Sequence, residues 1–316
     1  MSRYIVSRLI QAAVVLILVT VITFSLIHLA PGGPSAVLTD AKLPPEQIAR
    51  QRANLGLDKP VYVQFLKWAN GLVHGDFGIS YTDERTVLSE IGQRLPNTLI
   101  LAGTAFLLAL IVSIPVGIYT AQRARSIPDH IISGISFIGL STPVFWFGIV
   151  LIIIFSVQLH WLPASGMRTI NAPNSLPDLL KHLMMPALVL AMPTTAQFSR
   201  FVRASVLETL NQDYVRTARA KGLAPSIVTY RHVLRNALMP VVTIIGLTLP
   251  VVVTGAALTE TVFGWPGMGR LAVDAASTRD YPVIMGVTVL VAAVVILMNL
   301  LTDLAYMAID PRVRLR

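Results

Sequence analysis

The charged residues best placed for binding chemistry lie at residues 203–235, between two long apolar runs. Asp213 stands near the start of a helical stretch, and Arg219 and Lys221 stand near its end, as the helix dipole favours. Gly222 then predicts a left-handed stop at the helix C-terminus. The chemistry that this stretch allows is binding through charged groups.

A second short helix is expected after that glycine. Pro225 suits its first turn, and Ile227, Tyr230 and Leu234 recur at helical spacing on one stripe. Two short helices joined at a glycine form a compact knob, which could dock in a groove of another protein. The residues allow a second interpretation equally well, in which a basic amphipathic loop rests on lipid headgroups.

Catalytic patterns are missing from the sequence. Gly264 and Gly269 have the glycine spacing of a phosphate loop, but Arg270 and Leu271 replace the required lysine and hydroxyl residue. The six histidines form no HExxH motif, no GxSxG motif occurs, and cysteine is absent. We therefore expect a chain that is not an enzyme, has no catalytic or metal site, and binds no cofactor itself.

The elements that position the knob follow from composition. Of 316 residues, 54% are apolar and 13% are charged, with a mean hydropathy of +0.68, whereas soluble domains carry roughly 25% charge. A bilayer span needs about 20 apolar residues, and six uncharged runs are close to or above that length. They predict six transmembrane helices at residues 9–27, 95–122, 131–159, 183–199, 236–259 and 281–302.

The positive charge is concentrated on one side of this topology. With both termini in the cytoplasm, the inner segments hold 14 Lys and Arg, against 4 in the outer segments once the long first loop is set aside. Anionic lipids explain this placement, so the net charge of +9 does not indicate nucleic acid. Arg200 and Arg203 are expected to extend to the interface at the end of the fourth span.

The first outer loop, residues 31–94, is too long for a simple connector. It predicts one helix at residues 44–56 and another that begins after Pro60, followed by a turn at residues 75–78. The loop is either a packed cap on the helix ends or a surface for an external partner.

Prolines inside the predicted spans and acidic residues next to them are possible signs of a transport function. Six prolines are expected to bend their helices, either around a cavity or in static packing. They are Pro115, Pro143, Pro186, Pro193, Pro240 and Pro250. Glu260 and Asp303 follow uncharged runs and are expected at headgroup depth, so an ion-coupled carrier stays an unsupported alternative, as does a membrane enzyme or scaffold.

The loop at residues 204–235 resembles the EAA loop of ABC-importer permeases, especially the dipeptide and oligopeptide branch with its Y-V-R-T-A-R-A-K-G-L run and following R-N-A-L-x-P. Arg216, Thr217 and Ala218 occupy the EAA positions, and Gly222 is the glycine. Further matches occur at residues 3–9, 31–34, 75–78, 94–98, 263–269, 279–282 and 310–314.

The resemblance implies an all-α integral membrane protein with the type I importer permease fold and a helical extracytoplasmic loop after the first helix. It implies three regions: residues 1–94 with the first helix and its loop, the transmembrane domain at 95–303, and a cytoplasmic end at 304–316. The implied protein is the B-type subunit of a peptide importer in a prokaryotic inner membrane. Nickel, glutathione and oligosaccharides are alternative substrates in this branch.

The resemblance also implies the partners and the coupling residues. The partners are a homologous C-type permease, two ATPase subunits or domains that bind ATP and Mg²⁺, and an extracytoplasmic binding protein. The residues expected to couple ATPase motion to the membrane helices are Asp213, Tyr214, Arg216, Thr217, Ala218, Arg219, Lys221, Gly222, Tyr230 and Leu234. No residues of the substrate path are assigned.

Overall fold

The structure is a computed structural model that describes residues 2–30, 33, 57–173, 175–238, 240–241, 244, 246, 248 and 256–309. For residues 2–5, 225 and 304–309 it describes the backbone alone. The expected helix at residues 44–56, the motif at 310–314 and Pro250 lie outside the described residues.

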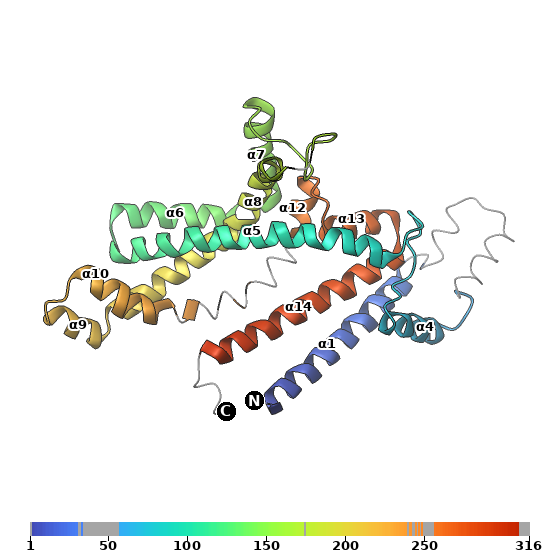
Figure 1. Cartoon of the computed structure of the whole chain (residues 1–316), viewed down its shortest axis with the longest axis horizontal. Helices are drawn as coiled ribbons and strands as arrows, with labels where there is room; N and C mark the ends of the chain where they lie inside the picture. Colours follow the sequence, from blue (N-terminus) through green and yellow to red (C-terminus); the bar gives the residue numbers. More distant parts are fainter. Residues whose placement is uncertain are drawn as a thin grey trace. The chain divides into compact units, whose positions relative to one another are not determined.

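The described residues form helices joined by turns and loops, and the β-structure among them is an isolated antiparallel bridge between Ile79 and Thr86. Figure 1 shows the helices in chain order. They are α1 (Ser2–Leu29), α4 (Val61–Val73), α5 (Val87–Gln122), α6 (Ile127–Ser141), α7 (Val144–Leu151), the π-helix η2 (Ile152–Gln158), α8 (Leu176–Leu210), α9 (Asp213–Ala220), α10 (Pro225–Ile227), the π-helix η3 (Val228–Val233), α12 (Ala256–Val262), α13 (Met268–Thr278) and α14 (Tyr281–Ile309).

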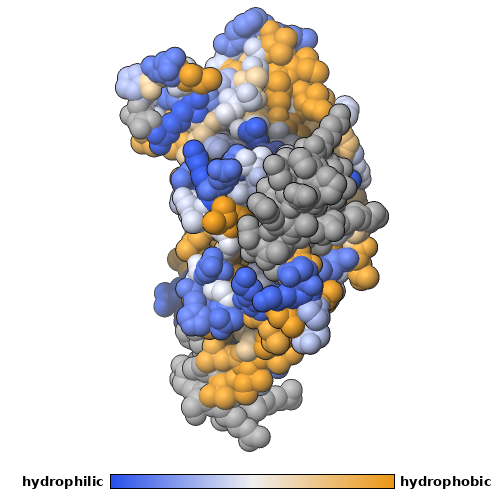
Figure 2. All heavy atoms as spheres, turned by 90° about the vertical axis from the view of Figure 1, so that its right-hand side faces the viewer, coloured by the Kyte–Doolittle hydropathy of each residue, from blue (hydrophilic) through white to orange (hydrophobic). Residues whose placement is uncertain are grey.

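Within the described residues, four helices are long and apolar enough to cross a membrane, namely Val6–Leu29, Val87–Gln122, Leu176–Leu210 and Tyr281–Asp303. A fifth candidate is the pair Ile127–Ser141 and Val144–Gln158, bent by 103°. These five coincide with predicted spans. The sixth prediction, residues 236–259, falls largely outside the described residues. Broad apolar areas on the surface, orange in Figure 2, match helices that face lipid.

The 103° bend lies at Pro143, as the sequence predicted. Thr142 before it is extended at φ −82° and ψ 124°, because a residue that precedes proline disfavours the helical conformation. At Pro115 and at Pro186 and Pro193, by contrast, α5 and α8 each continue as one helix. Proline therefore breaks one predicted span and leaves two continuous.

The chain divides into two compact units, of which the first comprises Met1–Pro96 and Gly267–Leu300. Its core packs the start of α5 against α13 and α14, with Val87, Ile91, Leu271 and Val283 buried. Gly286 is required there, because an added Cβ would lie 2.6 Å from the Cγ1 of Val87.

Asp280 organises the loop of the first unit. Its buried carboxylate accepts hydrogen bonds from Ser80 Oγ at 2.5 Å and from the Thr82 N–H at 3.1 Å. Burial and the nearby Asp280 raise the pKa of Tyr81 to about 12, so the phenol stays neutral. The preceding residue, Arg279, is left-handed at φ 57° and ends α13. The 279–282 motif thus places one carboxylate at the start of α14.

The predicted turn at residues 75–78 is confirmed. Gly75 and Gly78 have φ values of 80° and 85°, and the Gly78 N–H donates to Asp76 Oδ1 at 2.9 Å. The predicted helix after Pro60 is confirmed as α4. Its Phe65 contacts Phe24 of α1 with a ring-centroid distance of 5.3 Å, so this part of the loop packs on the first helix.

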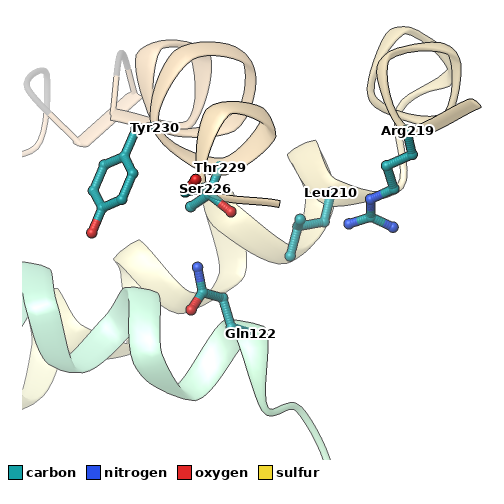
Figure 3. A pocket seen from close by; sticks show the side chains of 6 residues that line it. All are labelled: Gln122, Leu210, Arg219, Ser226, Thr229 and Tyr230. Atoms are coloured by element: carbon teal, nitrogen blue, oxygen red, sulfur yellow. The ribbon is translucent and has the colours of Figure 1, made fainter. Parts of the chain in front are cut away.

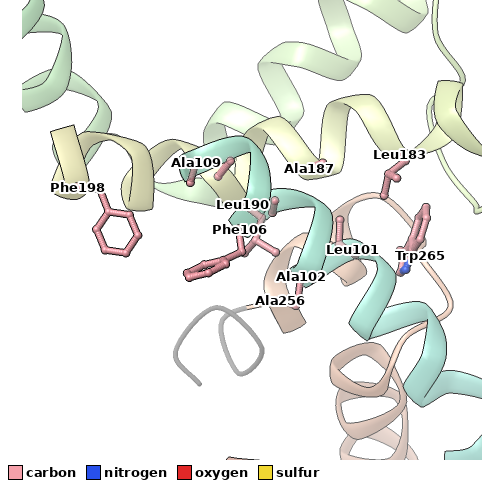
Figure 4. Close-up of a cluster of buried hydrophobic side chains, with 12 residues drawn as sticks. Leu101, Ala102, Phe106, Ala109, Leu183, Ala187, Leu190, Phe198, Ala256 and Trp265 are labelled. Carbon is pink, nitrogen blue, oxygen red and sulfur yellow. The ribbon is translucent and has the colours of Figure 1, made fainter. Parts of the chain in front are cut away.

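The second unit comprises Asn97–Pro266 and Leu301–Arg316. Its largest described cluster packs α5 against α8 and the segment that ends at Trp265 (Figure 4). Two hydrogen bonds join Asn97 to the segment Trp265–Pro266. Asn97 Nδ2 donates to the Pro266 carbonyl at 2.8 Å, and Trp265 Nε1 donates to the Asn97 carbonyl at 2.9 Å. The 94–98 and 263–269 motifs therefore meet in space.

Glu260 is fully buried in the second unit and accepts a hydrogen bond from Thr98 Oγ1 at 2.6 Å. Its expected position at headgroup depth stays a prediction. The Gly264 turn that follows, with φ 58°, connects α12 to α13. Trp265 in this segment is fully buried.

Candidate functional site: the knob at residues 213–238

The knob begins with α9, which confirms the predicted helix from Asp213. Gln212 is extended and precedes the first turn, and Asp213 is the acidic residue of that turn. The helix ends at Ala220, and Gly222 follows in the left-handed conformation at φ 76°, as predicted. The Gly222 N–H donates to the Arg219 carbonyl at 2.9 Å, so the glycine closes the helix end.

The inner face of α9 is fixed to the membrane helices of the same unit. Val215 is fully buried and Ala218 is 6% exposed. They pack in one cluster with Val202 and Val206 of α8 and with Ala121 of α5. A displacement of α9 must therefore displace the ends of α5 and α8, since a packed cluster transmits strain.

The second helix confirms the start at Pro225 but not the predicted stripe. The α10 turn continues as the π-helix η3, which buries Val228 and Val233. Of the predicted stripe, Leu234 is buried at 8% exposure, whereas Ile227 and Tyr230 are exposed. The physical reason is that i→i+5 bonding places more residues in each turn than the 3.6 assumed from the sequence.

The outer face of α9 is polar and exposed. It presents Asp213, Tyr214, Arg216, Thr217, Arg219 and Lys221. Arg216 forms only an exposed ion pair with Asp213, at 3.7 Å between Nη1 and Oδ1. Tyr214 Oη accepts a hydrogen bond from Asn236 Nδ2 at 3.0 Å, which connects the two helices of the knob.

The predicted site residues thus fall into two groups. Ala218 and Leu234 lie in the inner cluster and position the knob, whereas the other eight predicted residues are exposed. An open cleft of about 440 Å³ lies between the knob and the helix ends (Figure 3). It is lined by Gln122, Leu210, Arg219, Ser226, Thr229 and Tyr230. No pattern in the sequence predicts that Gln122, Ser226 and Thr229 line a cleft, because isolated polar residues carry no periodicity.

A buried ion pair anchors the helix that leads into the knob. Arg203 Nε and Nη2 each donate to the carboxylate of Asp129 at 2.7 Å, and Asp129 is 2% exposed. The Arg125 N–H donates to the same carboxylate at 2.8 Å. The sequence did not predict this partner of Arg203, whose expected position at the lipid interface stays a prediction. Arg200 lies over the Phe137 ring, 4.6 Å from its centroid.

A second contact ties the end of the knob to α8. Ser205 Oγ of α8 donates to the Ala237 carbonyl at 2.6 Å, after the π-helix. Among the described residues, no group of three or more His, Asp or Glu side chains could hold a metal ion. The knob thus has a packed inner side and a polar outer face.

The described residues contain apolar helices long enough to cross a membrane, and comparison with known proteins places the chain in a family of membrane transport components. Residues 113–315 match the model of the binding-protein-dependent transport system inner membrane component, and residues 1–102 match the model of the N-terminal part of such components. The chain belongs to this family and is a multi-pass membrane protein.

Its curated relatives are peptide permeases. The chain is 44% identical over 314 residues to the oligopeptide transport system permease protein AppB of Bacillus subtilis, with 99% of both chains covered. It is 40% identical over 336 residues to the dipeptide transport system permease protein DppB of Escherichia coli K12, again with 99% of both covered.

Solved structures support the fold. Two crystal forms of the inward-facing MetNI methionine ABC transporter contain a chain with TM-scores of 0.54 and 0.58 and identities of 18% and 19%. Each match covers 70% of this chain and 96% of the other. The fold is therefore that of an ABC-importer permease, as the sequence resemblance implied.

Proposed function

We propose that this chain is the B-type permease subunit of an ATP-driven, binding-protein-dependent importer of dipeptides or oligopeptides. Full-length similarity to AppB and DppB supports peptides as the substrate. The proposed partners are a homologous C-type permease, two ATPase subunits or domains that bind ATP and Mg²⁺, and an extracytoplasmic binding protein. The 14-to-4 distribution of basic residues supports cytoplasmic termini in an inner membrane.

The structure of α9 is the observation that supports coupling through the knob. Its exposed face carries Tyr214, Arg216 and Arg219, while its inner face is packed on α5 and α8. A partner ATPase that holds the outer face would move the membrane helices through the inner cluster. ATP binding at the partner would then shift the permease between two conformations.

The proposed division of the chain follows the same logic. Residues 1–94 would form the first helix and an external loop, residues 95–303 the transport domain with its coupling loop at 204–235, and residues 304–316 a cytoplasmic end. The chain would contribute half of the translocation path and no catalytic step, and ATP hydrolysis would belong to the partners.

Gly222 offers the sharpest test of the coupling assignment. Proline cannot adopt the φ of 76° observed there and lacks the N–H that donates to Arg219. Alanine at Gly222 adds strain of about 1–2 kcal/mol but no clash, because nothing lies within 4 Å of the added Cβ. We expect peptide uptake in reconstituted transporter to fall slightly with Gly222→Ala and to be lost with Gly222→Pro, while ATP hydrolysis continues.

Two controls keep this test decisive. Co-purification of the second permease and the ATPase measures assembly, and membrane abundance measures folding. Unchanged uptake by an assembled Gly222→Pro transporter would refute coupling through the knob. The substrate class is tested separately, by identifying the ligand of the co-purified binding protein by mass spectrometry; nickel, glutathione or an oligosaccharide in place of peptide would overturn that part.

A further inference from the structure

Helix α4 exposes a row of large apolar side chains that the first unit leaves uncovered. Tyr62, Leu66 and Val73 are 68%, 62% and 84% exposed. Their spacing of four and seven residues places them on one face of the helix. An exposed apolar row of this kind needs an apolar environment, because apolar side chains that stay in water do not gain the free energy of burial.

An adjoining face of α4 is fixed to α1. The rings of Phe65 and Trp68 lie 5.3 and 5.6 Å from the ring of Phe24. His28 Nε2 and Gln64 Oε1 are 3.1 Å apart in a hydrogen bond. These contacts set both the position and the rotation of α4 on the first helix.

The contact point lies near the C-terminal end of α1. Phe24 lies five residues before Leu29, the last residue of the apolar helix Val6–Leu29 that is long enough to cross a membrane. At 1.5 Å per residue, the contact is about 7.5 Å along the helix axis before that residue. Helices that lie in a membrane surface bury their apolar faces about 5–10 Å into the boundary between headgroups and acyl chains.

The distribution of side chains around α4 fits such a surface. At 3.6 residues per turn, the apolar side chains from Trp68 to Leu66 cover an arc of about 160°. Lys67 and Asn70 are exposed on the remaining side. The α1 contacts occupy one edge of the apolar arc and leave the edge with Leu66 open.

We propose that α4 is an interfacial helix that lies in the membrane surface where α1 ends, with Tyr62, Leu66 and Val73 in lipid and Lys67 and Asn70 in water. The helix thereby holds the long loop against the bilayer. This inference requires only that α1 spans the membrane, so it stands apart from the proposed function.

The absence of cysteine from the chain permits a direct test. Leu66→Cys and the control Lys67→Cys, which lie about 100° apart around α4 and are both exposed, are spin-labelled in the assembled transporter in liposomes. Labelled unsubstituted transporter gives the background from partner chains. Collision with oxygen, which concentrates in the bilayer, is compared with collision with a water-soluble nickel chelate.

We expect the Leu66→Cys label to meet oxygen more often than nickel and the Lys67→Cys label to show the reverse order. Tyr62→Cys should report the same depth as Leu66→Cys and replaces it if that variant does not accumulate. Strong nickel access on both faces would overturn the proposal by placing α4 in water. Protection of the Leu66→Cys label from both reagents would also overturn it, because a protein partner would then cover the row.

Discussion

The buried pair of Asp129 and Arg203 allows a quantitative test of how the knob is anchored. Arg203→Ala leaves the 2%-exposed carboxylate of Asp129 with the hydrogen bond from the Arg125 N–H. Removing one partner of a buried ion pair costs about 3–5 kcal/mol. Because the Arg203 side chain is 31% exposed, water partly fills the vacated space, and we expect about 3 kcal/mol.

The reverse truncation is expected to cost less. After Asp129→Ala, the partly exposed guanidinium of Arg203 can extend to water, so the loss is about 1–2 kcal/mol, the scale of a lost charge-assisted hydrogen bond. The double variant no longer buries an unpaired charge. The loss of stability in the double variant should therefore be about 2 kcal/mol smaller than the sum of the two single losses, a coupling typical of residues in direct contact.

The assay is reversible unfolding of the purified chain in mixed micelles of a mild detergent and SDS, followed by the fluorescence of its four tryptophans. Arg216→Ala is the matched control, because it removes the exposed pair with Asp213 and should not change stability measurably. Additive single effects, or an Asp129→Ala loss larger than that of Arg203→Ala, would refute the reasoning.

Two further predictions concern α5. Gly117→Ala should destabilise the chain by about 1–3 kcal/mol, because the added Cβ would lie 2.6 Å from the Cβ of Val202. The control Gly103→Ala, whose added Cβ has nothing within 4 Å, should stabilise the chain by about 0.5–1 kcal/mol. Equal effects of the two variants in the same unfolding assay would contradict this. Thr98→Val should cost about 1–2 kcal/mol by removing the 2.6 Å hydrogen bond to Glu260, and an unchanged midpoint would show that this bond contributes nothing.

The family resemblance came from short motifs, and the structure explains why some of them recur together in one chain. Asn97 and Trp265 are far apart in sequence, yet each supplies a hydrogen bond to the other's segment. The glycines of the 75–78 turn have positive φ, and Asp280 gathers donors from the loop that follows. These residues have structural roles in the fold, whereas most side chains on the outer face of α9 are exposed to solvent.

The sequence by itself determined the local features of this protein. Long uncharged runs predicted five spans that the described residues contain, because an apolar segment of that length is stable only outside water. The sequence also predicted the start of α9 and its end before Gly222. The helix dipole favours an acidic residue at the start of a helix, and the left-handed conformation after its end favours glycine.

Only the tertiary structure decided which distant side chains pair and which face of each helix is buried. Arg203 could extend to lipid or bind Asp129, 74 residues away, and no periodic pattern distinguishes the two. Helical spacing placed Ile227, Tyr230 and Leu234 together, but the π-turn changed the phase and buried Val228 and Val233 instead. Local propensity and hydropathy act over a few residues, whereas these outcomes depend on which distant surfaces pack together, and that packing is a property of the folded chain.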